Sequence, residues 1–144
     1  MIFVTVGTSE PFDRLLRALE PLETGEELVV QRGVSTVDLP GATCVDFLPF
    51  PELVLHLQRA RVVVMHAGAG SVIAALANGK QPIVVPRLRV HREAVDDHQV
   101  AFGRRLHEAG LVRLVEDPAD LASELQKLPP AAGVQEEGVG TLAA

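Results

Sequence analysis

The sequence predicts an α/β protein with a Rossmann-like, doubly wound parallel sheet, and three observations lead to that fold class. Short apolar runs alternate along the chain with segments of helical spacing, which is the pattern of successive βαβ units. The run at 62–65 is apolar at every position, as in a strand covered by helices on both faces. The chain has 144 residues, enough for one hydrophobic core and too few for two ordinary domains.

Apolar spacing and turn residues define the elements of the first half. The β-branched and aromatic run that opens the chain ends at Gly7, as a buried strand does. Behind Pro11, which a first helical turn tolerates, apolar residues recur at helical spacing. The expected elements are a strand at 2–6, a helix from Phe12, strands at 27–31 and 43–47, and a helix at 52–59 after a break at Pro49 and Pro51.

The same signals define the second half. The apolar run at 62–65 leads into a segment of small residues, and the helical spacing that follows stops at Gly79. Gly110 closes a longer helical segment in the position of a C′ glycine. The expected elements are a strand at 62–65, a helix at 70–78, a strand at 82–86, a helix at about 94–109, a strand at 111–115, and a helix from Pro118 to about 128.

Composition narrows the class of protein. One domain is expected over residues 1–128, followed by a flexible tail at 129–144 that is rich in Pro, Ala, Gly and Glu. The net charge of −6 leaves no electrostatic footprint for nucleic acid, and the single cysteine, Cys44, suits a reducing compartment. No apolar run reaches the roughly 18 residues of a membrane span, and the first residues lack a basic signal region. A cytoplasmic protein is therefore expected.

The candidate binding segment follows the strand at 62–65. It consists of His66-Ala67-Gly68-Ala69-Gly70-Ser71 and runs directly into a helix. Ligands of open α/β sheets bind outside the carboxyl ends of the strands. Small residues let a ligand approach the backbone, a helix N-terminus offers free N–H groups, and His66 and Ser71 add side-chain donors. Together these features predict a cradle for a diphosphate.

Each residue of this segment also has a purely structural interpretation. Glycines fit tight strand–helix turns, a serine often caps a helix, and a histidine at a strand end is often only packed in place. Their combination within six residues favours binding. A nicotinamide-dinucleotide site is disfavoured, because that fingerprint lies in the first βαβ unit and carries a third glycine.

Five segments, in this order and spacing, point to a known family: 2–8, 11–15, 66–71, 79–86 and 97–99. With them, the stretch from 1 to about 128 resembles the C-terminal domain of glycosyltransferase family 28, one half of a GT-B fold. It looks most like the small soluble subunits of two-piece N-acetylglucosaminyltransferases, of the dolichol-oligosaccharide or bacterial exopolysaccharide type. A short signature at Gln31 and Gly33 also matches, without an assigned role.

The resemblance implies roles for individual residues. Phe47 and Leu48 lie in the segment whose backbone reads the base in the family. Asp97, His98 and Gln99 match the positions that contact the donor sugar. The residues implied in donor diphosphate binding are Gly7, Thr8, His66, Gly68, Ala69, Gly70 and Ser71.

The function implied is the donor-binding subunit of an inverting, metal-independent glycosyltransferase. Its donor would be a UDP-sugar, UDP-N-acetylglucosamine in the first place, with no further cofactor. The implied partner is a membrane-associated subunit that binds a lipid-linked acceptor, supplies the catalytic base and recruits this chain to the inner face of a membrane. A homo-oligomer is left open. Two alternatives are a non-catalytic nucleotide-sugar-binding or regulatory subunit of the same fold, and a nucleotide-sugar epimerase, which the short length disfavours.

One position departs from the family pattern. Relatives carry an acidic residue three positions after the motif serine, where it binds the ribose hydroxyls, and this chain carries Ala74. Losing such a charge-assisted bond costs roughly 1.5–3 kcal/mol. Glu93 or the acidic residues at 96–97 could substitute, the nucleotide could differ, or the chain could bind weakly and act as a regulator.

Charged residues between the last strands have alternative interpretations. The carboxylates at 96–97 also suit a solvated helix start. A metal site made with His91 is disfavoured because the spacing matches no recognised ligand set. The loop that carries Arg87, Arg89 and Arg92 is expected either to face a phosphate or to be solvated.

Overall fold

Six parallel strands form the sheet of this protein, in the order β3-β2-β1-β4-β5-β6. The computed structural model describes residues 1–128, so the tail predicted at 129–144 lies outside the described residues. Every neighbouring pair of strands runs parallel, which confirms the predicted doubly wound sheet. The strands are β1 (Ile2–Thr5), β2 (Leu28–Gln31), β3 (Thr43–Val45), β4 (Val62–His66), β5 (Ile83–Val85) and β6 (Arg113–Leu114).

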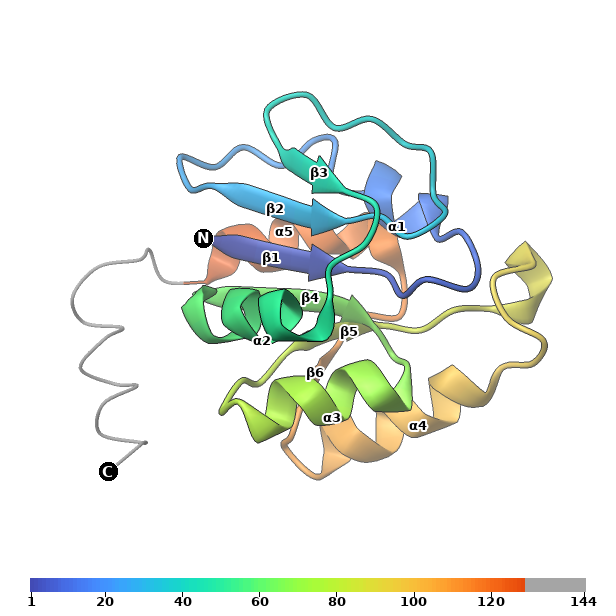
Figure 1. Ribbon diagram of the computed structural model, residues 1–144. Coiled ribbons are helices and arrows are strands. Elements are labelled where there is room, and N and C mark those ends of the chain that lie inside the picture. The colour runs from blue at the N-terminus through green and yellow to red at the C-terminus, as the bar shows by residue number, and fades with distance from the viewer. Residues whose placement is uncertain (129–144) are drawn as a thin grey trace.

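Helices cover both faces of this sheet (Figure 1). Residues of α1 and α5 pack with one set of strand side chains around Phe12, Leu16 and Leu121. Residues of α2, α3 and α4 pack with the other set, around Phe3 and Met65. The helices are α1 (Asp13–Arg17), α2 (Phe50–Arg59), α3 (Ala69–Ala77), α4 (His98–Glu108) and α5 (Leu121–Lys127), with 3₁₀ turns η1 (Arg89–His91) and η2 (Pro118–Asp120).

The central strands are buried because alternate side chains enter the two apolar clusters. Val4 and Val64 belong to the cluster under α1 and α5, whereas Phe3 and Val63 belong to the cluster under α2, α3 and α4. Strand side chains alternate between the faces of a sheet, so a strand covered on both faces is apolar throughout. This is the physical reason that the run at 62–65 indicated a parallel sheet.

Several predicted boundaries differ from the structure. The strand predicted at 43–47 ends at Val45, and α2 begins at Phe50 rather than 52. Pro51 does not break the chain, because it lies in the first turn of α2, where a missing N–H costs nothing. The helix predicted at about 94–109 begins only at His98, and η2 precedes α5 where one continuous helix was expected.

The segment between β5 and α4 is held away from helical geometry by side-chain bonds. The backbone of Arg92 has a left-handed conformation, with φ of 56°. The Glu93 carboxylate is turned inward, where it accepts from Leu88 N at 3.0 Å. The Asp96 carboxylate accepts from His98 N at 2.9 Å. These local bonds compete with helix formation, and α4 starts after them. Within the described residues, no helix has the length and apolar character needed to cross a bilayer.

Candidate functional site

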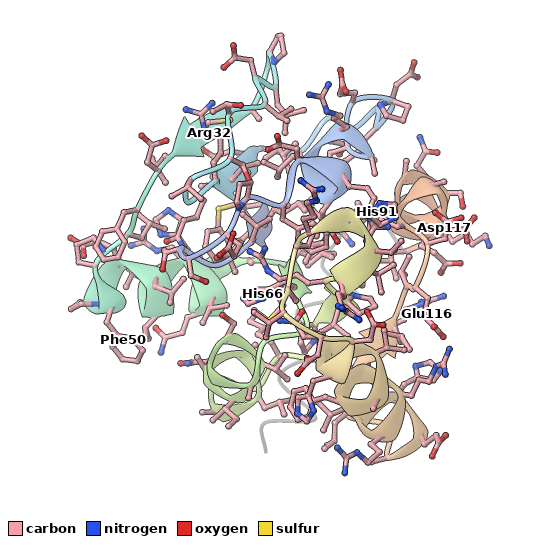
Figure 2. The ribbon with its side chains drawn as sticks, turned by 90° about the vertical axis from the view of Figure 1, so that its right-hand side faces the viewer. Arg32, Phe50, His66, His91, Glu116 and Asp117 are labelled. Atoms are coloured by element: carbon pink, nitrogen blue, oxygen red, sulfur yellow. The ribbon has the colours of Figure 1, made fainter. Side chains whose placement is uncertain are left out.

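The carboxyl edge of the sheet has its topological switch point between β1 and β4. From β1 the chain continues to β2 and β3 on one side, and from β4 it continues to β5 and β6 on the other. Loops that leave in opposite directions open a crevice at such a point, where ligands of doubly wound proteins bind. Gly7 follows β1 and His66 ends β4, so the structure brings these two predicted site residues together. Figure 2 looks onto this edge, with His66 near its centre.

The His66 ring lies between two glycines that leave no room for a side chain. A Cβ atom on Gly7 would lie 2.9 Å from His66 Nε2, and one on Gly68 would lie 2.2 Å from His66 Cε1. Gly7 also has a φ of 79°, in the left-handed region that favours glycine. The position of the imidazole therefore requires both glycines, one after β1 and one within the histidine motif.

The two nitrogens of His66 each meet a polar neighbour. His66 Nε2 lies 3.2 Å from Ser71 Oγ. On the other side, Arg87 Nε donates to His66 Nδ1 at 3.4 Å, and Gln99 Nε2 lies 3.5 Å from the same atom. Burial, and secondarily the Arg87 charge, lowers the pKa of His66 from 6.5 to about 4. The imidazole is neutral at physiological pH.

The first turn of α3 offers backbone donors beside this ring. The first helical hydrogen bond of the segment runs from Val72 N to Gly68 O. The N–H groups of Ala69, Gly70 and Ser71 come before this bond and have no acceptor within the helix. Ala69 and Gly70 are exposed, and a Cβ atom on Gly70 would meet nothing within 4 Å. Gly70 thus leaves open space in front of donors that carry the positive end of the helix dipole, an arrangement suited to an anion.

Arg87 is a buried cation bound by main-chain carbonyls. Its guanidinium donates to the carbonyl oxygens of Val6, Glu10, Pro11 and Glu93, and it stacks 5.0 Å from the centre of the Phe12 ring. Burial lowers its pKa, an effect that the nearby Glu93 and Glu10 charges oppose. The guanidinium ties the loop after β1 to the loop after β5.

The prediction of a phosphate-facing or solvated arginine loop is therefore wrong for Arg87, whose side chain is only 4% exposed. Arg89 and Arg92 are exposed and line a surface hollow with Glu10, Ala94 and Val95. His91 lies on the same loop, to one side of His66 in Figure 2.

Glu93 forms the buried ion pair of this edge. Its carboxylate accepts from Arg14 Nε and Nη2, both at 2.9 Å, and from Leu88 N at 3.0 Å. The carboxylate side chain is 6% exposed. The suggestion that Glu93 replaces the missing ribose-binding acid is wrong, because its oxygens are buried and occupied. Ala74 itself is half-buried against the apolar cluster of α2, α3 and α4.

Gln31 links the sheet to the predicted base-binding segment. Its amide is buried, donates to Thr5 Oγ1 at 3.0 Å, and accepts from Leu48 N at 2.9 Å. Phe47 and Leu48 lie in the loop between β3 and α2, with Phe47 63% exposed. Gln31 thereby holds this loop at the same edge as His66 and gives its signature a structural role.

Residues 96–99 surround the start of α4. Asp97 Oδ1 accepts from Arg89 N at 2.9 Å, and both Asp97 and His98 are exposed. Gln99 Oε1 accepts from Arg87 N at 3.0 Å, while its amide nitrogen faces His66. Gln99 is therefore near the histidine motif, and both of its polar atoms are engaged within the protein. Through residue 128, no three His, Cys, Asp or Glu side chains gather into a group that could hold a metal ion.

The sequence did not reveal the structural roles of three residues at this edge, which are Arg87, Glu93 and Gln31. Each acts by contacting a segment distant in the chain, such as Arg14, which is 79 residues from Glu93. Only Gln31 carried a signal, as part of the short matched signature.

Comparisons with known proteins agree with this architecture. The profile of the glycosyltransferase family 28 C-terminal domain matches residues 1–137. The UDP-N-acetylglucosamine transferase subunit ALG13 of Homo sapiens is 32% identical over 122 residues, and that of Mus musculus is 33% identical over 157. These matches cover 76% and 90% of this chain, which spans 10% and 13% of the relatives' lengths.

Solved structures share the fold. The glycosyltransferase SnogD from Streptomyces nogalater superposes with a TM-score of 0.65 at 23% identity, and the calicheamicin glycosyltransferase CalG4 with 0.64 at 21%. Each match covers 94% of this chain and 36% of the larger protein. The predicted fold class, a single Rossmann-like half of a GT-B glycosyltransferase, is confirmed.

Proposed function

The chain belongs to the family of glycosyltransferase family 28 C-terminal domains, and from that membership we propose that it is the donor-binding subunit of an N-acetylglucosaminyltransferase that uses a UDP-sugar. The single observation that carries the proposal is the set of donors at the switch point. His66, Ser71 and the first N–H groups of α3 converge there beside the open space at Gly70. UDP-N-acetylglucosamine is the donor we favour, because both mammalian relatives are named as subunits of a transferase for that compound.

In this proposal the diphosphate lies against the start of α3. Transfer of the sugar leaves negative charge on the diphosphate as the bond to the anomeric carbon breaks. Donors fixed in place before the reaction stabilise such charge without reorganising, and this can be worth several kcal/mol. The α3 N–H groups and the Ser71 hydroxyl would do this work without a metal ion. Gly7 and Thr8, in the loop after β1, would close the cradle on the other side of the switch point.

The remaining parts of the donor are assigned by place. We propose that Phe47 and Leu48 contact the base and that Asp97, His98 and Gln99 lie toward the sugar. β3 is three strand positions from β4, which is about 14 Å at the usual strand spacing. An extended nucleoside diphosphate bridges a gap of that order, so the loop held by Gln31 and the His66 motif can contact one ligand.

A second subunit would complete the enzyme. SnogD and CalG4 are longer chains of which this one matches 36%, and the ALG13 relatives are named as subunits. We propose that the partner is membrane-associated, binds a lipid-linked acceptor and carries the catalytic base, so that an acceptor hydroxyl attacks with inversion. It would bring this subunit to the cytoplasmic face of the membrane.

Ala74 favours one other function, a nucleotide-sugar-binding subunit without turnover. The Ala74 methyl group cannot accept hydrogen bonds from the ribose hydroxyls. Glu93 is not free to replace the missing acid, because its carboxylate is already bound to Arg14 and Leu88 N. The two functions differ in the reconstituted pair. Sugar transfer that requires this chain together with its partner supports the enzyme, and transfer by the partner alone supports the regulatory subunit.

Isothermal titration with UDP, UDP-N-acetylglucosamine, UDP-glucose and GDP tests the donor site. We expect UDP compounds to bind, and we expect His66→Ala and Ser71→Ala each to weaken UDP binding by about ten- to a hundredfold. Ser71→Ala removes a hydroxyl donor to the charged ligand, and His66→Ala removes the ring that contacts and orients this hydroxyl. Ser123→Ala, in the exposed part of α5, is the matched control and should bind normally. Circular dichroism checks that all variants fold. Unchanged affinity in both site variants would refute the diphosphate site.

A further inference from the structure

The hydrogen bonds around His66 have a fixed direction. Arg87 Nε lies 3.4 Å from His66 Nδ1, and a guanidinium has N–H donors and no acceptor. This contact therefore requires a lone pair on Nδ1. An arginine stays protonated at every pH that a folded protein tolerates, so the requirement is permanent.

Gln99 adds a second constraint of the same sign. Its Oε1 accepts from Arg87 N at 3.0 Å, and a main-chain N–H can only donate. The amide orientation of Gln99 is thereby determined, and the atom left facing His66 Nδ1, at 3.5 Å, is the NH₂ group. Two donors from different segments therefore point at one ring nitrogen.

We propose that Arg87 and Gln99 are positioning residues that hold His66 as the neutral tautomer with its proton on Nε2. The partner of one ring nitrogen determines the proton on the other. The Nε2–H group donates to Ser71 Oγ, 3.2 Å away, so the Ser71 oxygen acts as acceptor and its own hydrogen points elsewhere. That hydrogen is the one available to an anionic ligand, a step that rests on the proposed function.

The arrangement also determines what His66 cannot do. Its only lone pair faces a guanidinium, so the ring cannot act as a general base toward an acceptor hydroxyl. Groups from the loop after β1, from α3, from the loop after β5 and from α4 surround the ring. In residues 1–128 its hydrogen-bond partners are Ser71, Arg87 and Gln99, with no carboxylate among them. The same surroundings lower the pKa of His66, first because the ring is buried and second because another proton would have to enter beside the Arg87 charge.

Two-bond ¹H–¹⁵N correlation spectra of the ¹⁵N-histidine-labelled chain test this directly. A protonated and an unprotonated ring nitrogen give well-separated ¹⁵N signals, and the His66→Ala spectrum identifies the His66 signals among the five histidines. At pH 7.5 we expect Nε2 to be protonated and Nδ1 unprotonated. A proton on Nδ1 would overturn the proposal.

Gln99→Glu tests whether the surroundings impose this state. The substitution replaces the NH₂ group with a carboxylate oxygen, which favours a proton on Nδ1 and raises the pKa of His66. Gln81→Glu makes the same chemical change on an exposed residue that donates to Gly110 O, and it should leave the His66 signals unmoved. If Nδ1 in Gln99→Glu gained its proton only at the same pH as in the wild-type chain, the proposal would be contradicted.

Titrating UDP into the same samples separates this inference from the proposed function. The expected tautomer without UDP binding would refute the donor-site function and leave the assignment of Arg87 and Gln99 intact. UDP binding to a chain whose His66 carries its proton on Nδ1 would do the reverse. Ser71→Ala should keep the wild-type tautomer while binding UDP about ten- to a hundredfold more weakly.

Discussion

The two edges of the sheet satisfy their charged groups in different ways. At the amino edge, the Glu26 carboxylate binds Arg61 and, at 3.1 Å, the amino group of Met1. At the carboxyl edge, the buried Arg87 is bound by carbonyls and a neutral histidine. The amino edge thus neutralises charge with charge. The carboxyl edge keeps a cation that is hydrogen-bonded by carbonyl dipoles rather than by a carboxylate, with the Glu93 and Glu10 charges nearby.

Because of this difference, the charges of the amino edge serve stability, whereas those of the carboxyl edge suit the binding of an anion. A closed set of opposite charges presents nothing to a ligand, whereas oriented donors without a matching anion present a positive potential. A buried ion pair at the carboxyl edge, Arg14–Glu93, fixes the loop that carries Arg87. The two edges should therefore respond differently to the same substitution, to acid and to ligand.

The largest expected effect comes from neutralising the acid at each edge. Glu93→Gln leaves Arg14 largely buried without its counter-ion and should lower the free energy of unfolding by about 3–5 kcal/mol. Glu26→Gln is the matched change at the amino edge, where the carboxylate is more exposed, and should cost about 1 kcal/mol. Urea unfolding with a shared slope measures both. Equal losses would mean that the two edges do not differ in this respect.

Acid should affect the two edges in different pH ranges. The unfolded chain protonates His66 near pH 6.5, but the folded chain does so only near pH 4. Between these values the unfolded state binds more protons, so the free energy of unfolding falls as pH falls, by about 3 kcal/mol in all. Arg61 lowers the pKa of Glu26 below 4.5, so its contribution is present above that value and is lost at lower pH.

Urea titrations from pH 8 to pH 3.5 follow these two losses. His66→Asn should flatten the curve between pH 6.5 and pH 4 and leave the lower range unchanged. Glu26→Gln should do the opposite. A wild-type stability that is constant from pH 6.5 to pH 4 would contradict the buried, neutral state of His66.

Two glycines of the motif provide the smallest contrast. Gly68→Ala should displace the His66 ring, since the new Cβ would lie 2.2 Å from His66 Cε1. We therefore expect it to weaken UDP binding by about ten- to a hundredfold. Gly70→Ala meets no protein atom and should stabilise the fold by about 0.5–1 kcal/mol through better helix propensity. Its methyl group enters the open space, so UDP should still bind a few-fold more weakly. Isothermal titration and thermal melts of both variants check these expectations. If Gly70→Ala bound UDP with normal affinity, the ligand would not occupy the space in front of Gly70.

The parts of this structure that were predictable depend on local pattern. Each strand of the sheet was anticipated because burial on both faces makes a strand a short apolar run. The helix α3, expected at 70–78 and found at Ala69–Ala77, was anticipated because glycines and a serine after His66 mark a tight turn into a helix. The His66 ring lies so close to the backbone of Gly7 and Gly68 that a Cβ atom at either position would clash with it, which supplies the physical reason for glycine there.

The unpredicted parts depend on pairings across the chain. Residues 94–97 have helical spacing, but the bonds of Glu93 and Asp96 outweigh a few tenths of a kcal/mol of helix propensity per residue. Arg87 follows a strand and precedes a polar loop, so its sequence context favours an exposed side chain. Its burial depends on carbonyls of residues 6–11 that happen to converge on it in space.

The outward hydrogen of Ser71 gives the site a sensitivity to the ligand's own protons. A terminal phosphate takes up a proton near pH 6, whereas the diphosphate of a nucleotide sugar is esterified at both ends and takes up none near neutrality. A donor-rich edge binds fully ionised oxygens best. Under the proposed function, mild acid would loosen the spent nucleotide while leaving the donor bound, so acidity would favour product departure over substrate loss.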